Sequence, residues 1–148
     1  MKLVLPTAED TRAFGKRLAA VLRAGDLILL TGRLGAGKTV LAQGIGAGLG
    51  VSGRVVSPTF VIARWHPGPV QLVHVDAYRL GSLAEVDDLD LDVDTATAVV
   101  VVEWGSGLVE QLSDSHLEIV LTRAEGSEER TAELHPRGGD WADRIAAL

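Results

Sequence analysis

The chain has 148 residues, 47% of them hydrophobic and 23% charged, which is the size and composition of one folded domain over residues 1–148. Its 20 acidic and 14 basic residues give a formal net charge of −6, which argues against direct nucleic-acid binding. The absence of cysteine excludes disulfides, cysteine-bound metals and thiol catalysis. No apolar run is long enough to cross a membrane and no signal peptide is evident, so we expect a cytoplasmic protein.

The first predicted element is a helix that begins after Thr7. Thr7 and Asp10 have the spacing of a capping box, and apolar residues follow with a helical period as far as Leu22. Gly25 is expected to end this helix. A continuous apolar run over residues 26–31 then predicts a strand that is covered on both faces.

A glycine-rich loop follows at residues 32–37, and a second helix is predicted from about Lys38. Three glycines lower the helix propensity of this segment and indicate either close packing against a neighbour or weak helix ends. They are Gly44, Gly46 and Gly48.

The rest of the chain predicts five strands, at residues 60–65, 70–76, 98–103, 117–122 and 131–134. Pro-Gly-Pro at 67–69 predicts that the first two form an antiparallel hairpin. Residues 82–94 predict a short helix that runs into an acidic stretch, which lacks the glycine and terminal glutamate of a calcium-binding EF-hand and is better interpreted as a solvated face. We therefore predict an α/β fold with a mixed sheet and helices on both faces.

Residues 32–39, GRLGAGKT, match the phosphate-loop pattern G-x-x-x-x-G-K-[ST] in full, between a predicted strand and a predicted helix. Backbone N–H groups of such a loop and the positive end of the following helix converge on phosphate oxygens. Lys38 is expected to reach the β and γ phosphates, and the Thr39 hydroxyl to bind Mg²⁺. The expected nucleotide-binding residues are Gly32, Gly35, Ala36, Gly37, Lys38, Thr39 and Val40. The sheet is accordingly expected to be of the P-loop NTPase type, with central parallel strands plus the hairpin.

Two carboxylates end predicted strands and are candidates to complete a magnesium site. Glu103 follows a run of four valines, and Asp76 ends the strand before it. Ligands collect at the carboxyl ends of parallel strands, although a helix cap or a surface acid would give the same pattern. His74 is either a packed histidine or a residue that faces the site, and Trp104 is either a lid or core.

The segment Ser57-Pro58-Thr59-Phe60 lies where many phosphate-loop hydrolases keep a mobile segment that senses the γ-phosphate. Pro58 forces extended backbone at Ser57 and leaves the Ser57 and Thr59 hydroxyls available. The same four residues also fit a plain turn into the strand that begins at Phe60.

Taken together, the motifs at residues 32–39, 57–60, 74–80 (HVDAYRL) and 103–104 (EW) resemble, in their order and in a chain this short, the bacterial TsaE (YjeE) family. The resemblance implies a compact ATPase that uses ATP and Mg²⁺. It also implies that the protein works with the paralogous pair TsaB and TsaD to form threonylcarbamoyladenosine in tRNAs that read codons beginning with A. On this view tRNA is contacted only through the partners, and no membrane is involved.

The resemblance also implies roles for individual residues. Lys38 and Thr39 would hold nucleotide and magnesium, Glu103 would be the second magnesium ligand, and Asp76 would be the catalytic or Walker B-type acid, with Lys38 also catalytic. Ser57 to Phe60 would be the switch-like segment, and the adenine would lie near residues 7–11 and the late strands. Arg33 departs from the family, which usually has an acidic residue there.

Two other functions fit the phosphate loop. A small-molecule kinase would need an arginine-rich lid, and the 11 arginines of this chain are dispersed. A nucleotide-gated binding module without useful turnover would not need the two acids, Asp76 and Glu103.

Overall fold

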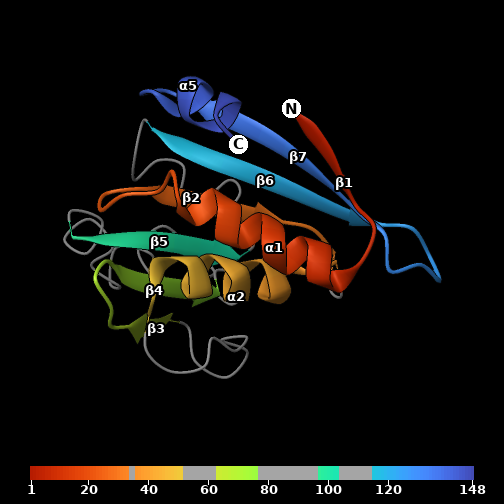
Figure 1. Ribbon diagram of the computed structural model, residues 1–148, viewed down its shortest axis with the longest axis horizontal. Helices are drawn as coiled ribbons and strands as arrows, with labels where there is room; N and C mark the ends of the chain where they lie inside the picture. The colour runs from red at the N-terminus through yellow and green to blue at the C-terminus, as the bar shows by residue number, and fades with distance from the viewer. Residues whose placement is uncertain (34–35, 52–62, 77–96, 104–114) are drawn as a thin grey trace.

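The computed structural model describes residues 1–33, 36–51, 63–76, 97–103 and 115–148. Its centre is a seven-stranded sheet in the order β1-β7-β6-β2-β5-β4-β3 (Figure 1). The strands are β1 (Lys2–Leu5), β2 (Leu27–Thr31), β3 (Ala63–His66), β4 (Gln71–Asp76), β5 (Ala98–Glu103), β6 (His116–Arg123) and β7 (Arg130–Arg137). The described helices are α1 (Ala8–Ala19), α2 (Lys38–Leu49) and α5 (Trp141–Ala146).

The sheet is mixed, as predicted. Strands β4, β5, β2 and β6 run parallel to their neighbours in the centre, while β3 pairs antiparallel with β4, and β7 antiparallel with both β6 and β1. The hairpin predicted around Pro-Gly-Pro is therefore confirmed. In the parallel part, Glu103 is in register with Leu30 on one side and with Asp76 on the other. The carboxyl ends of three strands thus meet at one edge of the sheet.

One face of the sheet is covered by α1 and α2, which lie side by side across it in Figure 1. Phe14 and Leu18 of α1 are fully buried in one cluster with the sheet residues Ile28 and Leu30. The two helices approach so closely that a Cβ added to Gly44 would lie 2.2 Å from the Arg12 carbonyl oxygen. The close packing predicted for this glycine is therefore confirmed.

Residues of β2 and β5 that point to the other face are also buried. Leu27, Leu29, Val100 and Val102 are at most 1% exposed. This burial confirms the prediction that the apolar run ending at Thr31 is covered on both faces. The helix predicted over residues 82–94 lies outside the described residues. The helices that the structure describes cover one face of the sheet.

The first helix is shorter than predicted. It begins with the expected capping box of Thr7 and Asp10, but it ends at Ala19 rather than near Gly25. The chain then turns tightly, and Asp26 accepts a hydrogen bond from the Arg23 backbone N–H at 2.7 Å, while Arg144 donates to the Val21 carbonyl at 2.8 Å. These two backbone groups are therefore bound by side chains and not by a further turn of the helix, and one of the side chains comes from the distant C-terminal helix.

Two elements were not predicted at all. Strand β1 has four residues and forms by pairing with β7, at the other end of the chain. Helix α5 has six residues, too few to show a helical period, and buries Trp141 and Ile145 in the cluster beneath α1. The longest described helices have 12 residues, whereas a bilayer-spanning helix needs about 20, so none of them can span a membrane.

Candidate nucleotide-binding site

The glycine-rich loop joins the end of β2 to the start of α2, as predicted. Gly37 is the N-cap residue of α2 and has φ = 104°, a left-handed conformation that a residue with a Cβ rarely adopts. Gly37 has no side chain, so the first N–H groups of α2 receive no capping hydrogen bond from this position. The N-terminus of a helix presents backbone N–H donors and the positive end of the helix dipole, which together are suited to an anion.

Lys38 extends over this loop and is only 5% exposed. Its Nζ donates to the carbonyl oxygen of Gly32 at 2.6 Å and to that of Arg33 at 3.1 Å. These carbonyls hold the ammonium group inside the loop, where a phosphate would meet it. Of the other predicted nucleotide-binding residues, Thr39 and Val40 are half-buried in the first turn of α2, and Gly35 lies outside the described residues.

The loop sits tightly against the neighbouring strand β6. A Cβ added to Gly32 would lie 2.6 Å from the Leu121 carbonyl oxygen and 3.2 Å from the Cβ of Ala36. Glycine is therefore required at the first position of the motif for a steric reason, and Ala36 is itself buried.

On the β5 side of the loop lies a buried acid. Glu103 is 5% exposed, and its Oε2 is 2.6 Å from Nε2 of His74, which has no exposed surface. Glu103 lies on the same face of β5 as Val99 and Val101, which belong to the core beneath α1 and α2. It therefore faces the helix layer that includes the start of α2. His74 is therefore packed, as one of its two interpretations expects, and it also contacts the predicted magnesium ligand, as the other expects.

Asp76 lies beside Glu103 in the register of β4 and β5, so the backbone brings both predicted acids to one edge of the sheet. Among the described residues there is no cluster of three or more His, Asp or Glu side chains that could bind a metal. Mg²⁺ usually takes only one or two protein ligands and completes its shell with phosphates and waters, and the Thr39 hydroxyl and the Glu103 carboxylate are oxygen donors of the kind it prefers. The segment 57–60 and Trp104 lie outside the described residues.

On the β7 side of the loop lies a residue that the sequence analysis missed. Arg130, the first residue of β7, is 8% exposed, and its Nε donates to the Ala36 carbonyl at 3.3 Å. A second guanidinium nitrogen, Nη1, donates to the Glu128 carbonyl. Burial, and next the charge of Arg123, lower the pKa of Arg130 from its usual value. No local motif marks this arginine, because its partner in the loop is 94 residues away in the chain.

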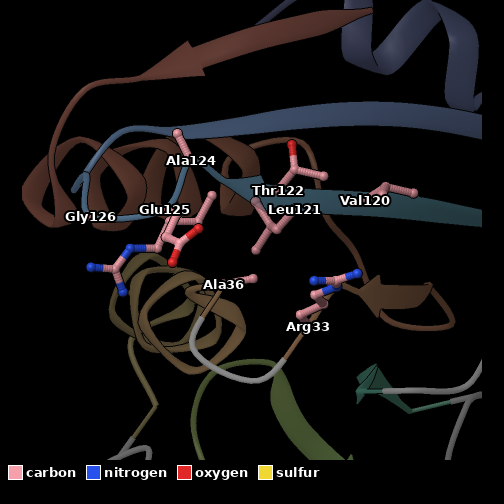
Figure 2. Close-up of a pocket in the computed structure, with 10 residues that line it drawn as sticks. Arg33, Ala36, Val120, Leu121, Thr122, Ala124, Glu125 and Gly126 are labelled. Atoms are coloured by element: carbon pink, nitrogen blue, oxygen red, sulfur yellow. The ribbon is translucent and has the colours of Figure 1, made fainter.

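A cavity of about 740 Å³ opens between the loop and the end of β6 (Figure 2). Gly32, Arg33 and Ala36 line it from the loop, and residues 120–126 line it from β6 and the turn that follows. In the view of Figure 2, Arg33 and Glu125 lie on opposite sides of Ala36. The volume falls within the range of small-molecule sites.

The start of α1 also reaches the loop. Thr11 is 1% exposed, and its methyl group would lie 3.9 Å from a Cβ added to Gly37. Both regions that the sequence analysis named for the adenine, the start of the first helix and a late strand, therefore border the phosphate loop.

Comparison with known proteins gives one consistent family. The family model described as threonylcarbamoyl adenosine biosynthesis protein TsaE matches residues 5–132. A protein of Streptomyces coelicolor named tRNA threonylcarbamoyladenosine biosynthesis protein TsaE is 55% identical over 139 residues, which cover 88% of this chain and 93% of that protein. A protein of the same name from Mycobacterium tuberculosis is 52% identical over 138 residues, which cover 86% and 82%.

The fold agrees with these sequences. A crystal structure of Bacillus subtilis YdiB superposes with a TM-score of 0.81 at 32% identity, covering 99% of this chain and 92% of that one. The α/β fold with a mixed sheet is thus found in a solved structure as well. The chain belongs to the TsaE family.

Proposed function

We propose that this protein is a Mg²⁺-dependent ATPase that acts as an accessory subunit in the formation of threonylcarbamoyladenosine in tRNA. Membership of the TsaE family supports the role in this pathway. The ATPase activity rests chiefly on one observation, which is that Lys38 and the uncapped N-terminus of α2 lie at the sheet edge where the strand of Glu103 ends.

The residues suggest how the chain handles ATP. The triphosphate lies over the start of α2, and Lys38 exchanges its contacts with the Gly32 and Arg33 carbonyls for phosphate oxygens. Thr39 and Glu103 would hold Mg²⁺, which neutralises phosphate charge when bound. His74 keeps the Glu103 carboxylate in one orientation through the 2.6 Å contact. Asp76 is the acid assigned to the attacking water, and the cavity between Ala36 and β6 receives the nucleoside.

The energy of hydrolysis would be used by partner proteins. We propose that the partners are the TsaB–TsaD pair, that tRNA is contacted only through them, and that all of them work in the cytoplasm. The net charge of −6 is consistent with a chain that does not hold RNA itself. Arg130 is held by the carbonyls of Ala36 and Glu128 at the loop, so a partner is expected to help orient the attacking water.

The test is phosphate release from Mg²⁺-ATP by the purified protein, alone and with the TsaB–TsaD pair of the same organism. We expect slow turnover alone and strong stimulation by the pair. Equal turnover in both samples would contradict the accessory role. ADP formation that depends on an added metabolite, without the pair, would instead favour a small-molecule kinase.

A further inference from the structure

Arg130 has an unusual environment for a buried cation. The guanidinium is bound by two backbone carbonyls, those of Ala36 and Glu128, and within the described part of the chain no carboxylate lies at ion-pair distance from it. Arg123, with which it is paired in the register of β6 and β7, adds a like charge. The exposed carboxylate of Glu128 opposes the effect of Arg123 without contacting the guanidinium, so among the described residues Arg130 has no counterion in direct contact.

A buried charge without a counterion is costly, and most proteins pair such groups. A buried arginine cannot lower this free-energy cost by losing a proton, because its guanidinium stays charged in proteins. It has five N–H donors, of which the two carbonyls use one each. The remaining donors and the charge are suited to an anion.

The position of Arg130 beside the phosphate loop indicates that this anion is a phosphate group. A Cβ added to Gly37 would lie 3.3 Å from Nε and 3.8 Å from Cγ of Arg130, so the arginine packs against the residue at which α2 begins. Its hydrogen bond to Ala36 fixes the peptide just before that residue. The positive end of α2 and Lys38 lie at the same point of the loop.

We propose that Arg130 holds the Ala36–Gly37 peptide in its phosphate-binding conformation and supplies a positive charge, additional to that of Lys38, for the phosphates of the bound nucleotide. This role rests on the proposed nucleotide binding. Arg130 is then a positioning residue of the phosphate loop that is contributed by the last strand of the sheet, rather than a structural arginine of β7.

The test is equilibrium binding of ADP to the full chain without partners, measured at low and at high salt. We expect Arg130→Gln to weaken ADP binding by about tenfold or more and to reduce its salt dependence. Arg130→Lys keeps the charge, so the salt dependence should stay as in the wild type while the affinity falls by a smaller factor. Arg137→Gln, at the exposed far end of the same strand, is the matched control and should bind as the wild type does.

The outcomes separate the two proposals. If the wild type binds no ADP, the proposed function fails. If the wild type binds ADP and folded Arg130→Gln binds it equally, or with unchanged salt dependence, the role of Arg130 is wrong. Thermal unfolding reports whether each variant folds, and if Arg130→Gln does not fold, wild-type ADP affinity in Arg130→Lys overturns the proposal.

Discussion

Two arginines, the half-buried Arg144 and the buried Arg130, have very different surroundings in two regions of this protein. Arg144 in α5 forms a two-point ion pair with Asp26 at 2.7 and 2.8 Å and a further one with Asp140 at 3.1 Å. Its pKa is raised, first by the hydrogen bond to Asp26. Within the described residues Arg130, at the phosphate loop, donates its hydrogen bonds to the carbonyl oxygens of Ala36 and Glu128, and burial is the main cause that lowers its pKa.

The difference distinguishes an arginine that stabilises the fold, Arg144, from one that we propose contributes to ligand binding, Arg130. Around α5 the carboxylates that neutralise the arginine belong to the chain, so the cluster is complete in itself and ties the C-terminus to the turn after α1. At the loop, the phosphates of the proposed nucleotide would supply the negative charge that contacts Arg130.

The largest effect is expected from Lys38, which lies in the phosphate loop near Arg130. Lys38→Ala removes the ammonium that the loop holds over the phosphate site, and we expect partner-stimulated ATP hydrolysis to fall by about 1,000-fold. The rate of hydrolysis is measured as phosphate release from Mg²⁺-ATP in the presence of the partner pair. Lys16→Ala, at an exposed position of α1, is the control, and hydrolysis by Lys38→Ala at the rate of this control would refute the assignment of the loop.

Glu103 is next, because it is the buried acid beside the loop. Glu103→Gln keeps the shape of the side chain but removes its charge, so turnover with Mg²⁺ should fall by about 100-fold. ADP binding without Mg²⁺ should change little, because the loop and Lys38 are intact. Glu129→Gln, an exposed change near β7, serves as the reference. If turnover and Mg²⁺-free binding fell together, Glu103 would be a structural residue instead.

In the ion-pair cluster around α5, Arg144→Met should lower the stability of the protein while leaving nucleotide binding intact. It leaves Asp26 buried without its charged partner, although methionine still packs on the Trp141 ring, which Arg144 covers at 3.8 Å. We expect a loss of about 2 kcal/mol in the free energy of unfolding by urea. A variant as stable as the wild type would show that the ion pair does not tie α5 to the sheet.

The smallest effect concerns Asp140, on the exposed rim of the same cluster. The hydrogen bond from Arg23 is the main cause that lowers its pKa from 3.8. A carboxyl whose pKa is lower in the folded state stabilises the protein above the unfolded pKa, and this contribution is lost as the pH falls through the folded pKa. The stability difference between wild type and Asp140→Asn should therefore shrink below about pH 4. Urea unfolding at several pH values would reveal a constant difference if this assignment is wrong.

The parts of the fold that depend on local sequence were predictable. The central strand, the start of α2 at Lys38 and strand β5 over residues 98–103 all follow from apolar runs and the loop motif. The end of α1, strand β1 and the role of Arg130 depend on contacts across the whole chain, such as that of Arg144 with Val21. No short window of sequence contains both partners of such a contact.

The candidate site divides in the same way. The motif and the strand ends were enough to bring Lys38, Glu103 and Asp76 to one edge of the sheet. The sequence could not decide whether His74 packs in the core or faces the site, because a residue between two valines can have either environment. In the structure it is buried, and its contact with Glu103 joins two strands.

The central claim is that the loop and the two acids hydrolyse ATP for partner proteins. Its most direct test is phosphate release from Mg²⁺-ATP in the presence of the TsaB–TsaD pair, for the wild type, Asp76→Ala and Glu103→Ala. We expect the pair to stimulate the wild type strongly and both variants to lose this stimulation. Stimulated turnover in either variant equal to that of the wild type, or no stimulation of the wild type, would contradict it.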